Sequence, residues 1–219
     1  MNVKQLALGV MLALAATGAN AVQILGEGQN SSTNTVTGTA NGGNTATTIS
    51  VTSSPVTITN FAAGGTPLSA FLTLSATSTS AAVMLGGALD QHYSGTFTIT
   101  SLAGGGGTNY LSGSFIDDLS GVVGGAALTL GATTPPGTNV TFTSSVLTAA
   151  QLGEIRALAF SFSNVTAPVA ICGTTTCSFT ASQTGTFSAN IGVVPEPATL
   201  GLLGIALAGL GFVTRRKQA

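Results

Sequence analysis

Short runs of alternating apolar and hydroxyl-bearing residues are the feature that most constrains the fold of this 219-residue chain. In TFTIT at residues 96–100, VTFT at 140–143 and LAFSFS at 158–163, every second residue is apolar, and mostly Ser or Thr stands between. Such alternation is typical of strands with one face in a core and the other in water. The same pattern recurs at residues 56–59, 71–76, 114–117, 128–130, 177–181 and 186–191.

Glycine clusters and a proline pair separate these runs, for example Gly64-Gly65, Gly104 to Gly107 and Pro135-Pro136. Many short strands with turn signals between them predict an all-β body, folded as an antiparallel β-sandwich or jelly roll. Six phenylalanines at alternating positions are predicted to fill its core. They are Phe97, Phe142, Phe160, Phe162, Phe179 and Phe187.

Two segments depart from this pattern. Residues 22–48 are rich in Ser, Thr, Asn and Gly. Because such a composition buries little surface, we expect a mobile lead-in or an irregular edge there. Leu147–Phe160 includes AAQLGEIRAL after Thr148, which predicts a short helix or turn across one end of the sandwich, with Thr148 as its N-cap.

The body, residues 22–192, carries five acidic residues and a single cation, Arg156. A protein that binds nucleic acid needs several cations to replace condensed counterions. The composition therefore excludes nucleic acid as a partner.

The two cysteines of the chain, Cys172 and Cys177, lie in the stretch CGTTTC. A metal pair or a redox pair are the alternatives to a disulfide. A structural zinc site needs four ligands, yet His92 is the only histidine, and redox pairs usually have the spacing CxxC. In an exported protein the spacing favours a disulfide that closes a hairpin.

Asp90, His92, Asp117 and Asp118 are the side chains of the body best suited to chemistry. His92 with a serine and an aspartate would resemble a catalytic triad, but no GxSxG motif presents a nucleophile. The aspartates offer oxygen ligands to calcium, although neighbours such as Asp117 and Asp118 point to opposite faces of a strand. We expect no catalytic residue, cofactor or metal, and keep the four residues as a candidate ligand or calcium site against a solvated polar turn.

Threonines two residues apart, such as Thr96 and Thr98 or Thr141 and Thr143, have the local spacing of ice-binding surfaces. The sequence shows no uniform repeat that would align them in one plane. Threonine is also a common residue on the wet face of a strand. Ice binding is therefore a minor alternative.

The first 21 residues have the features of a secretory signal peptide. A positive region with Lys4 precedes an apolar run from Leu6 to Ala16. Ala19 and Ala21 form a small-x-small cleavage site, after which a polar chain follows. We expect cleavage after Ala21 and export of the body.

The C-terminal segment, residues 193–219, combines three features in a fixed order. Val194, Pro195, Glu196 and Pro197 form an extended stretch, because proline disfavours a helix. Residues 198–213 carry no charge and would form a transmembrane helix about 24 Å long. The basic residues that follow mark the cytoplasmic side; they are Arg215, Arg216 and Lys217.

This order, with a signal peptide at the other end, resembles the PEP-CTERM sorting module, which is also known as the ice-binding protein C-terminal domain. The resemblance implies a Gram-negative bacterium that makes exopolysaccharide. It further implies transient anchoring in the inner membrane, recognition by an exosortase, which is a membrane protease with a cysteine nucleophile, and release of the body. The resemblance covers residues 193–219 and leaves the body unassigned.

For the body we expect a non-enzymatic structural role at the cell surface or in the extracellular matrix, associated with exopolysaccharide or biofilm. The alternative is a carbohydrate-binding or carbohydrate-active module that uses loop residues such as Asp90, His92, Asp117 and Asp118. That alternative predicts that the four side chains converge in one pocket, whereas a structural role allows them to scatter.

Overall fold

The computed structural model describes residues 21–133 and 139–190, with the side chains of residues 117 and 133 left aside. The predicted signal peptide, transmembrane helix and sorting stretch therefore lie outside the described residues, apart from Ala21. The described part is almost entirely β-structure. Its strands are β1 (Val22–Gln29), β2 (Val36–Ala40), β3 (Thr47–Phe61), β4 (Leu68–Ser78), β5 (Val83–Leu85), β6 (Ala88–Thr100), β7 (Asn109–Val122), β8 (Leu128–Thr133), β9 (Val140–Thr143), β10 (Arg156–Thr166), β11 (Ile171–Cys172), β12 (Thr175–Thr176) and β13 (Phe179–Ala189).

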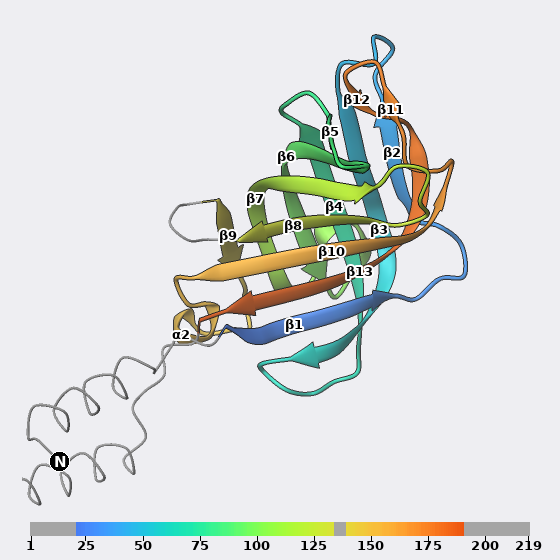
Figure 1. The fold of residues 1–219 in the computed structure, drawn as a ribbon. Coiled ribbons are helices and arrows are strands. Elements are labelled where there is room, and N and C mark those ends of the chain that lie inside the picture. Colours follow the sequence, from blue (N-terminus) through green and yellow to red (C-terminus); the bar gives the residue numbers. More distant parts are fainter. Residues whose placement is uncertain (1–20, 134–138, 191–219) are drawn as a thin grey trace, which may run out of the picture. The chain divides into compact units, whose positions relative to one another are not determined.

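Eleven of these strands form one antiparallel sheet. Pairing runs from β6 through β4, β3, β1, β13, β10 and β8 to β7, and β7 pairs back with β6. Figure 1 shows β1, β13, β10 and β8 crossing in front of β3, β4 and β6 at a steep angle. The predicted antiparallel all-β body is confirmed, but the two separate sheets of a sandwich are replaced by a single sheet that closes on itself.

The β6–β7 pair closes the sheet because these two long strands stay in register from Ala88↔Val122 to Ile99↔Leu111. Glycine allows neighbouring strands to approach this pair closely. A Cβ on Gly113 would collide with the carbonyl oxygen of Thr141, and one on Gly95 would lie 2.6 Å from the carbonyl oxygen of Ser75.

Residues 22–48 differ from the expectation of a mobile lead-in or irregular edge. β1 pairs with β13 on one side and with β3 on the other, so it is an interior strand of the sheet. Ile24 and Leu25 are fully buried. The polar composition of residues 22–48 gave no sign of this strand, because the segment has few apolar residues. Ile24 and Leu25 are among these few, and both lie in the core.

The predicted N-cap, Thr148, begins α2 (Ala149–Leu152). Its hydroxyl accepts a hydrogen bond from the backbone N–H of Gln151, whose side chain accepts one from the N–H of Thr148. The Arg156 guanidinium donates to the carbonyl oxygens of Leu152 and Gly153 at the C-terminal end of the helix. The helix is thus a single capped turn, after which the chain enters β10.

All six phenylalanines predicted for the core are buried. Phe97 lies at the centre of this cluster: its ring stacks on Phe187 at 4.8 Å between centroids and meets Phe142 and Phe160 edge-on at 6.0 Å. The predicted strands at 177–181 and 186–191 prove to be parts of one strand, β13.

Candidate functional site

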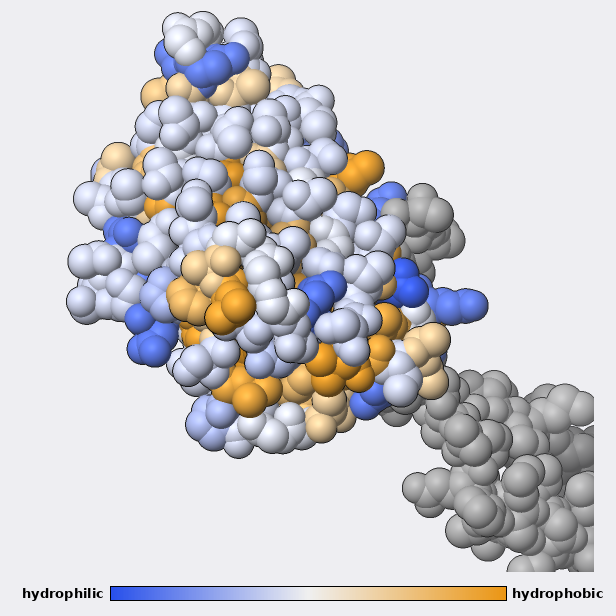
Figure 2. All heavy atoms as spheres, turned by 180° about the vertical axis from the view of Figure 1, so that it is seen from behind, coloured by the Kyte–Doolittle hydropathy of each residue, from blue (hydrophilic) through white to orange (hydrophobic). Residues whose placement is uncertain are grey.

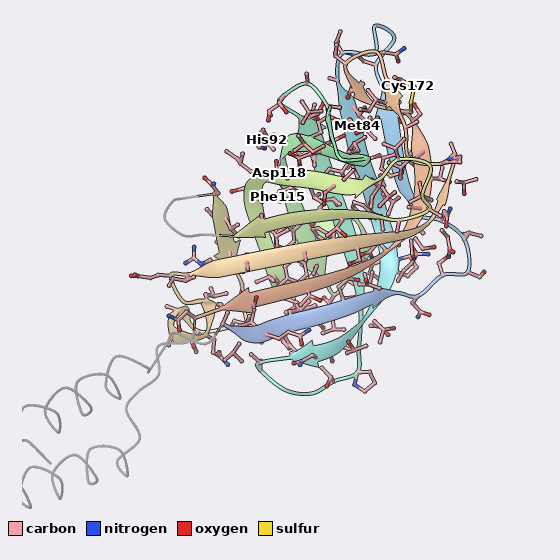
Figure 3. All side chains as sticks on the ribbon, in the orientation of Figure 1. Met84, His92, Phe115, Asp118 and Cys172 are labelled. Carbon is pink, nitrogen blue, oxygen red and sulfur yellow. A yellow bond between two sulfur atoms is a disulfide. The ribbon has the colours of Figure 1, made fainter. Side chains whose placement is uncertain are left out.

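Three of the four candidate residues meet on the outer side of the β6–β7 pair. The register places His92 opposite Asp118 and Asp90 opposite Ser120. His92 Nδ1 contacts the Asp118 carboxylate, with 59% of the histidine side chain and 37% of the aspartate side chain exposed. Figure 3 shows these two side chains next to each other. Asp117 pairs with Tyr93 instead, and its side chain is not described.

A small depression of about 210 Å³ adjoins this group, lined by Ser80, Ala81, Val83, Asp90, Gln91 and His92. Ser80 Oγ accepts a hydrogen bond from the backbone N–H of His92. No serine hydroxyl bonds to His92 Nε2 within residues 21–133 and 139–190, so the group has a base and a carboxylate but no bonded nucleophile. The same part of the chain has no cluster of three or more His, Cys, Asp or Glu side chains able to hold a metal ion.

The cysteines lie elsewhere, in the β11–β12 hairpin. Cys172 and Cys177 are joined in a disulfide, with their Cα atoms 4.9 Å apart. Thr175 and Thr176 of this hairpin are buried and bond to Gln91 of β6. Gln91 Oε1 accepts the backbone N–H of Thr176 at 3.0 Å and its hydroxyl at 2.7 Å. The bridged hairpin is therefore fixed to the sheet by buried polar contacts.

Tyr93 belongs to the same polar group. Its hydroxyl donates to Gln91 Oε1 at 3.3 Å. Burial raises the pKa of Tyr93 to about 12, although hydrogen bonds with Thr176 and Thr47 oppose the shift. The phenol is therefore neutral at physiological pH and acts as a hydrogen-bonding core residue.

Glu27 is the one acidic side chain that the structure describes as buried, and sequence analysis did not single it out. It lies on β1, where Gln183 Nε2 donates to Glu27 Oε2 at 3.1 Å. Glycine at 185 leaves room for the carboxyl, because a Cβ there would collide with Glu27 Oε1. Burial raises the pKa of Glu27 to about 7, and the Gln183 hydrogen bond offsets part of this shift.

The outer surface carries a further feature that the sequence did not reveal, namely rows of hydroxyl side chains that run across the strands. Residues directly opposite each other in an antiparallel pair project to the same side. The first row contains Thr37, Ser50, Ser75, Thr96, Ser114 and Thr141, each paired with the next. A second row contains Thr73, Thr98, Ser112 and Thr143.

A third row runs through Thr39, Thr48, Thr77 and Ser94 before Ile116 interrupts it. We call the three rows together the hydroxyl face. All of its members are exposed or partly exposed, and none is charged. Figure 2 shows the layer of β3, β4 and β6 from outside, largely in the pale colours of intermediate hydropathy with smaller orange areas.

Within the described parts of the chain, no helix is long and apolar enough to cross a membrane. The predicted membrane helix at residues 198–213 lies outside them. The decisive comparison concerns this same C-terminal segment: residues 193–217 match the family model described as PEP-CTERM protein-sorting motif.

The chain carries a PEP-CTERM sorting motif. This motif implies export, processing by an exosortase and association with the cell surface in a Gram-negative bacterium. The match contains the stretch Val194–Pro197 and the basic residues Arg215 to Lys217. No curated protein and no solved structure gives a significant match to the chain. The PEP-CTERM motif thus implies the route of the protein, and the body has to be interpreted from its own structure.

Proposed function

We propose that the body is a non-enzymatic component of the cell surface or extracellular matrix and that it associates with exopolysaccharide after exosortase has released it. The observation that carries this proposal is the hydroxyl face. Its side chains can donate and accept hydrogen bonds, and none of them carries a charge, a carboxylate or an imidazole. They suit lasting contact with a hydroxyl-rich matrix better than chemical conversion of it.

The His92 group supports this reading through its exposure. An active site usually closes around its reacting groups and excludes water. Here 59% of the His92 side chain and 37% of the Asp118 side chain are exposed. The buried carboxyl of the described body, that of Glu27, lies in the core instead.

A second candidate function is a carbohydrate-active or carbohydrate-binding module centred on Asp90, His92 and Asp118. The observation that favours it is that Asp90 and His92 line one depression and that Asp118 contacts His92. Asp90 and Asp118 are diagonal neighbours across the β6–β7 ladder, where such positions lie about 7–8 Å apart. A pair of carboxyl groups is also what most glycoside hydrolases use for catalysis.

An experiment in the native host separates the two functions. The gene would be deleted and complemented with the wild-type chain or with the triple variant Asp90→Asn, His92→Ala, Asp118→Asn. We expect both to be exported and to co-sediment equally with the washed exopolysaccharide matrix. Loss of matrix association or of matrix remodelling in the triple variant alone, at equal protein level, would favour the second function and overturn the first.

A further inference from the structure

We propose that the hydroxyl face is the binding surface for exopolysaccharide and that its ligand is an extended, neutral polysaccharide chain. This inference rests on the proposed function and names the surface and the ligand class. It starts from the register of five strand pairs, which places hydroxyl residues side by side on β2, β3, β4, β6, β7 and β9.

The spacing of the face is regular in two directions. Neighbouring strands in a sheet lie about 4.8 Å apart, and alternate residues along one strand about 7 Å apart. Hydroxyl groups at these intervals form a grid that is six strands wide in the first row. A polymer whose own hydroxyl groups recur along its length can meet such a grid at many points at once.

Hydrogen bonds within the grid hold some of these hydroxyls in place. Ser112 Oγ and Thr143 Oγ1 lie 2.8 Å apart, as do Ser114 Oγ and Thr141 Oγ1. Ser112 Oγ also accepts from Asn109 Nδ2 at 2.9 Å, and Thr141 Oγ1 accepts from the backbone N–H of Ser114 at 3.0 Å. A hydroxyl has one donor and two acceptor sites, so two such bonds still leave one site for a ligand. The side chains are thereby oriented before a ligand arrives, which lowers the entropy lost on binding.

Charge indicates a neutral ligand. None of the residues in the three rows is charged, and Arg156 is the only cation of the body. An anionic polysaccharide would find no cations on this surface to pair with its charges. A neutral polysaccharide needs no such ion pairs to bind. A hydrogen bond between a protein hydroxyl and a sugar hydroxyl replaces hydrogen bonds that both groups made to water, so each one contributes little to the affinity. The affinity therefore depends on how many such bonds form at the same time.

The shape of the sheet favours a polymer over ice. Adjacent strands of a sheet are rotated by about 20–25° relative to each other, and this sheet turns far enough to close on itself. A flat crystal face would meet only part of such a surface. A single polysaccharide chain is narrow enough to lie along one row and follow its curvature.

A different wall of the same sheet provides a matched control. Ser120, Thr129, Ser161 and Thr184 form a single hydroxyl row across β7, β8, β10 and β13. The row beside it consists of Asp118, Gly131, Ala159 and Thr186, so it has a single hydroxyl and the hydroxyls form no grid. The same substitutions on this wall remove as many hydroxyls while leaving the hydroxyl face intact.

The test compares the triple variant Thr96→Val, Ser114→Ala, Thr141→Val with the control Thr129→Val, Ser161→Ala, Thr184→Val. Processed protein secreted by the native host would be titrated with the host's purified exopolysaccharide, with a neutral β-glucan and with alginate as an anionic polymer. We expect the face variant to bind the neutral polymer at least tenfold more weakly than the wild type. The affinity of the control variant for the neutral polymer should stay within about twofold of the wild-type affinity. Alginate should bind to none of the proteins.

A further variant, Thr96→Ser with Thr141→Ser, keeps the hydroxyls and should bind like the wild type even if the valine variant is less stable. Equal loss in face and control variants, or tight binding of alginate, would overturn the proposal. So would ice recrystallisation inhibition by a wild-type protein that binds no glycan, since the face would then be an ice-binding surface. If all variants remain in the host's matrix, this surface assignment fails while the proposed matrix role stands.

Discussion

Val22, at the start of β1, pairs with Ala189, at the end of β13. The two ends of the described body therefore leave the sheet side by side. On the other side of Ala189 lies Arg156 of β10, and the N–H of Asn190 still bonds to the carbonyl oxygen of Ile155. From Thr184 to Ala189, β13 thus has a strand on each side, and the fold needs it up to Asn190.

From this pairing we expect exosortase to cut beyond Asn190. A cut within β13 would remove partners of both β1 and β10 and expose core residues such as Phe187. The intact mass of the released protein gives its C-terminus directly. A mature chain that ends before Asn190 and still melts cooperatively would contradict the described sheet.

Glu27 should make the stability of the protein fall as pH rises. Its pKa is about 7 in the folded protein and near 4.5 when unperturbed, so the folded state binds the proton more tightly. Protonated Glu27 contributes its full stabilisation below the unperturbed pKa. This contribution is lost as the pH rises through the pKa of the folded state, and the free energy of unfolding falls by at most about 3 kcal/mol.

Urea unfolding near pH 5 and near pH 8 would measure this effect in the wild type and in Glu27→Gln. The glutamine variant cannot ionise at this position, so we expect it to lose less stability between the two pH values. Equal losses in both proteins would show that Glu27 ionises without cost in the folded state.

The disulfide should contribute about 2 kcal/mol to the free energy of unfolding. The contribution is at the low end of the usual range because the bridged residues are only five apart in sequence. Replacing both Cys172 and Cys177 by serine should lower the free energy of unfolding by this amount. The buried threonines Thr175 and Thr176 hold the hairpin to Gln91, so the variant should still fold. Free thiols in the exported protein, detected by alkylation and mass spectrometry, would refute the bridge.

Phe97 should be among the most sensitive core positions, since its ring contacts three other phenylalanines. Phe97→Ala is expected to destabilise the protein by about 3–5 kcal/mol. Phe71, which is only partly buried, is the matched control. Phe71→Ala should lower the free energy of unfolding clearly less than Phe97→Ala. Thermal unfolding followed by far-UV circular dichroism measures both, and equal effects would contradict this core.

Local patterns were sufficient to predict the strands from residue 56 onward, except β5, and the aromatic core, because alternation shows directly which face of a strand is buried. They missed β1 and β2, whose polar composition predicted a mobile or irregular segment. They did not predict how the sheet closes, since this depends on the register between β6 and β7. The hydroxyl face was missed for the same reason. Thr96 and Thr141 are far apart in sequence, and only the pairing of both with Ser114 brings them into one row.

The candidate site was predicted in part. Asp90 and His92 are two residues apart on β6 and so share a face, which the sequence shows once the strand is known. The contact between His92 and Asp118 again required the register. Glu27 gave no local signal, because its burial results from β1 being an interior strand.

The sorting motif links the body to the cell surface, and one measurement in the native host tests its role directly. Pro195, Glu196 and Pro197 would be replaced together by alanine, with Gly192→Ala as a control outside the matched residues. Immunoblots of membrane and secreted fractions would then report the size and location of the protein. We expect the triple variant to be exported but to remain in the membrane fraction, about 2–3 kDa heavier than the processed form. A triple variant that is shortened and released like the wild type would contradict sorting by an exosortase.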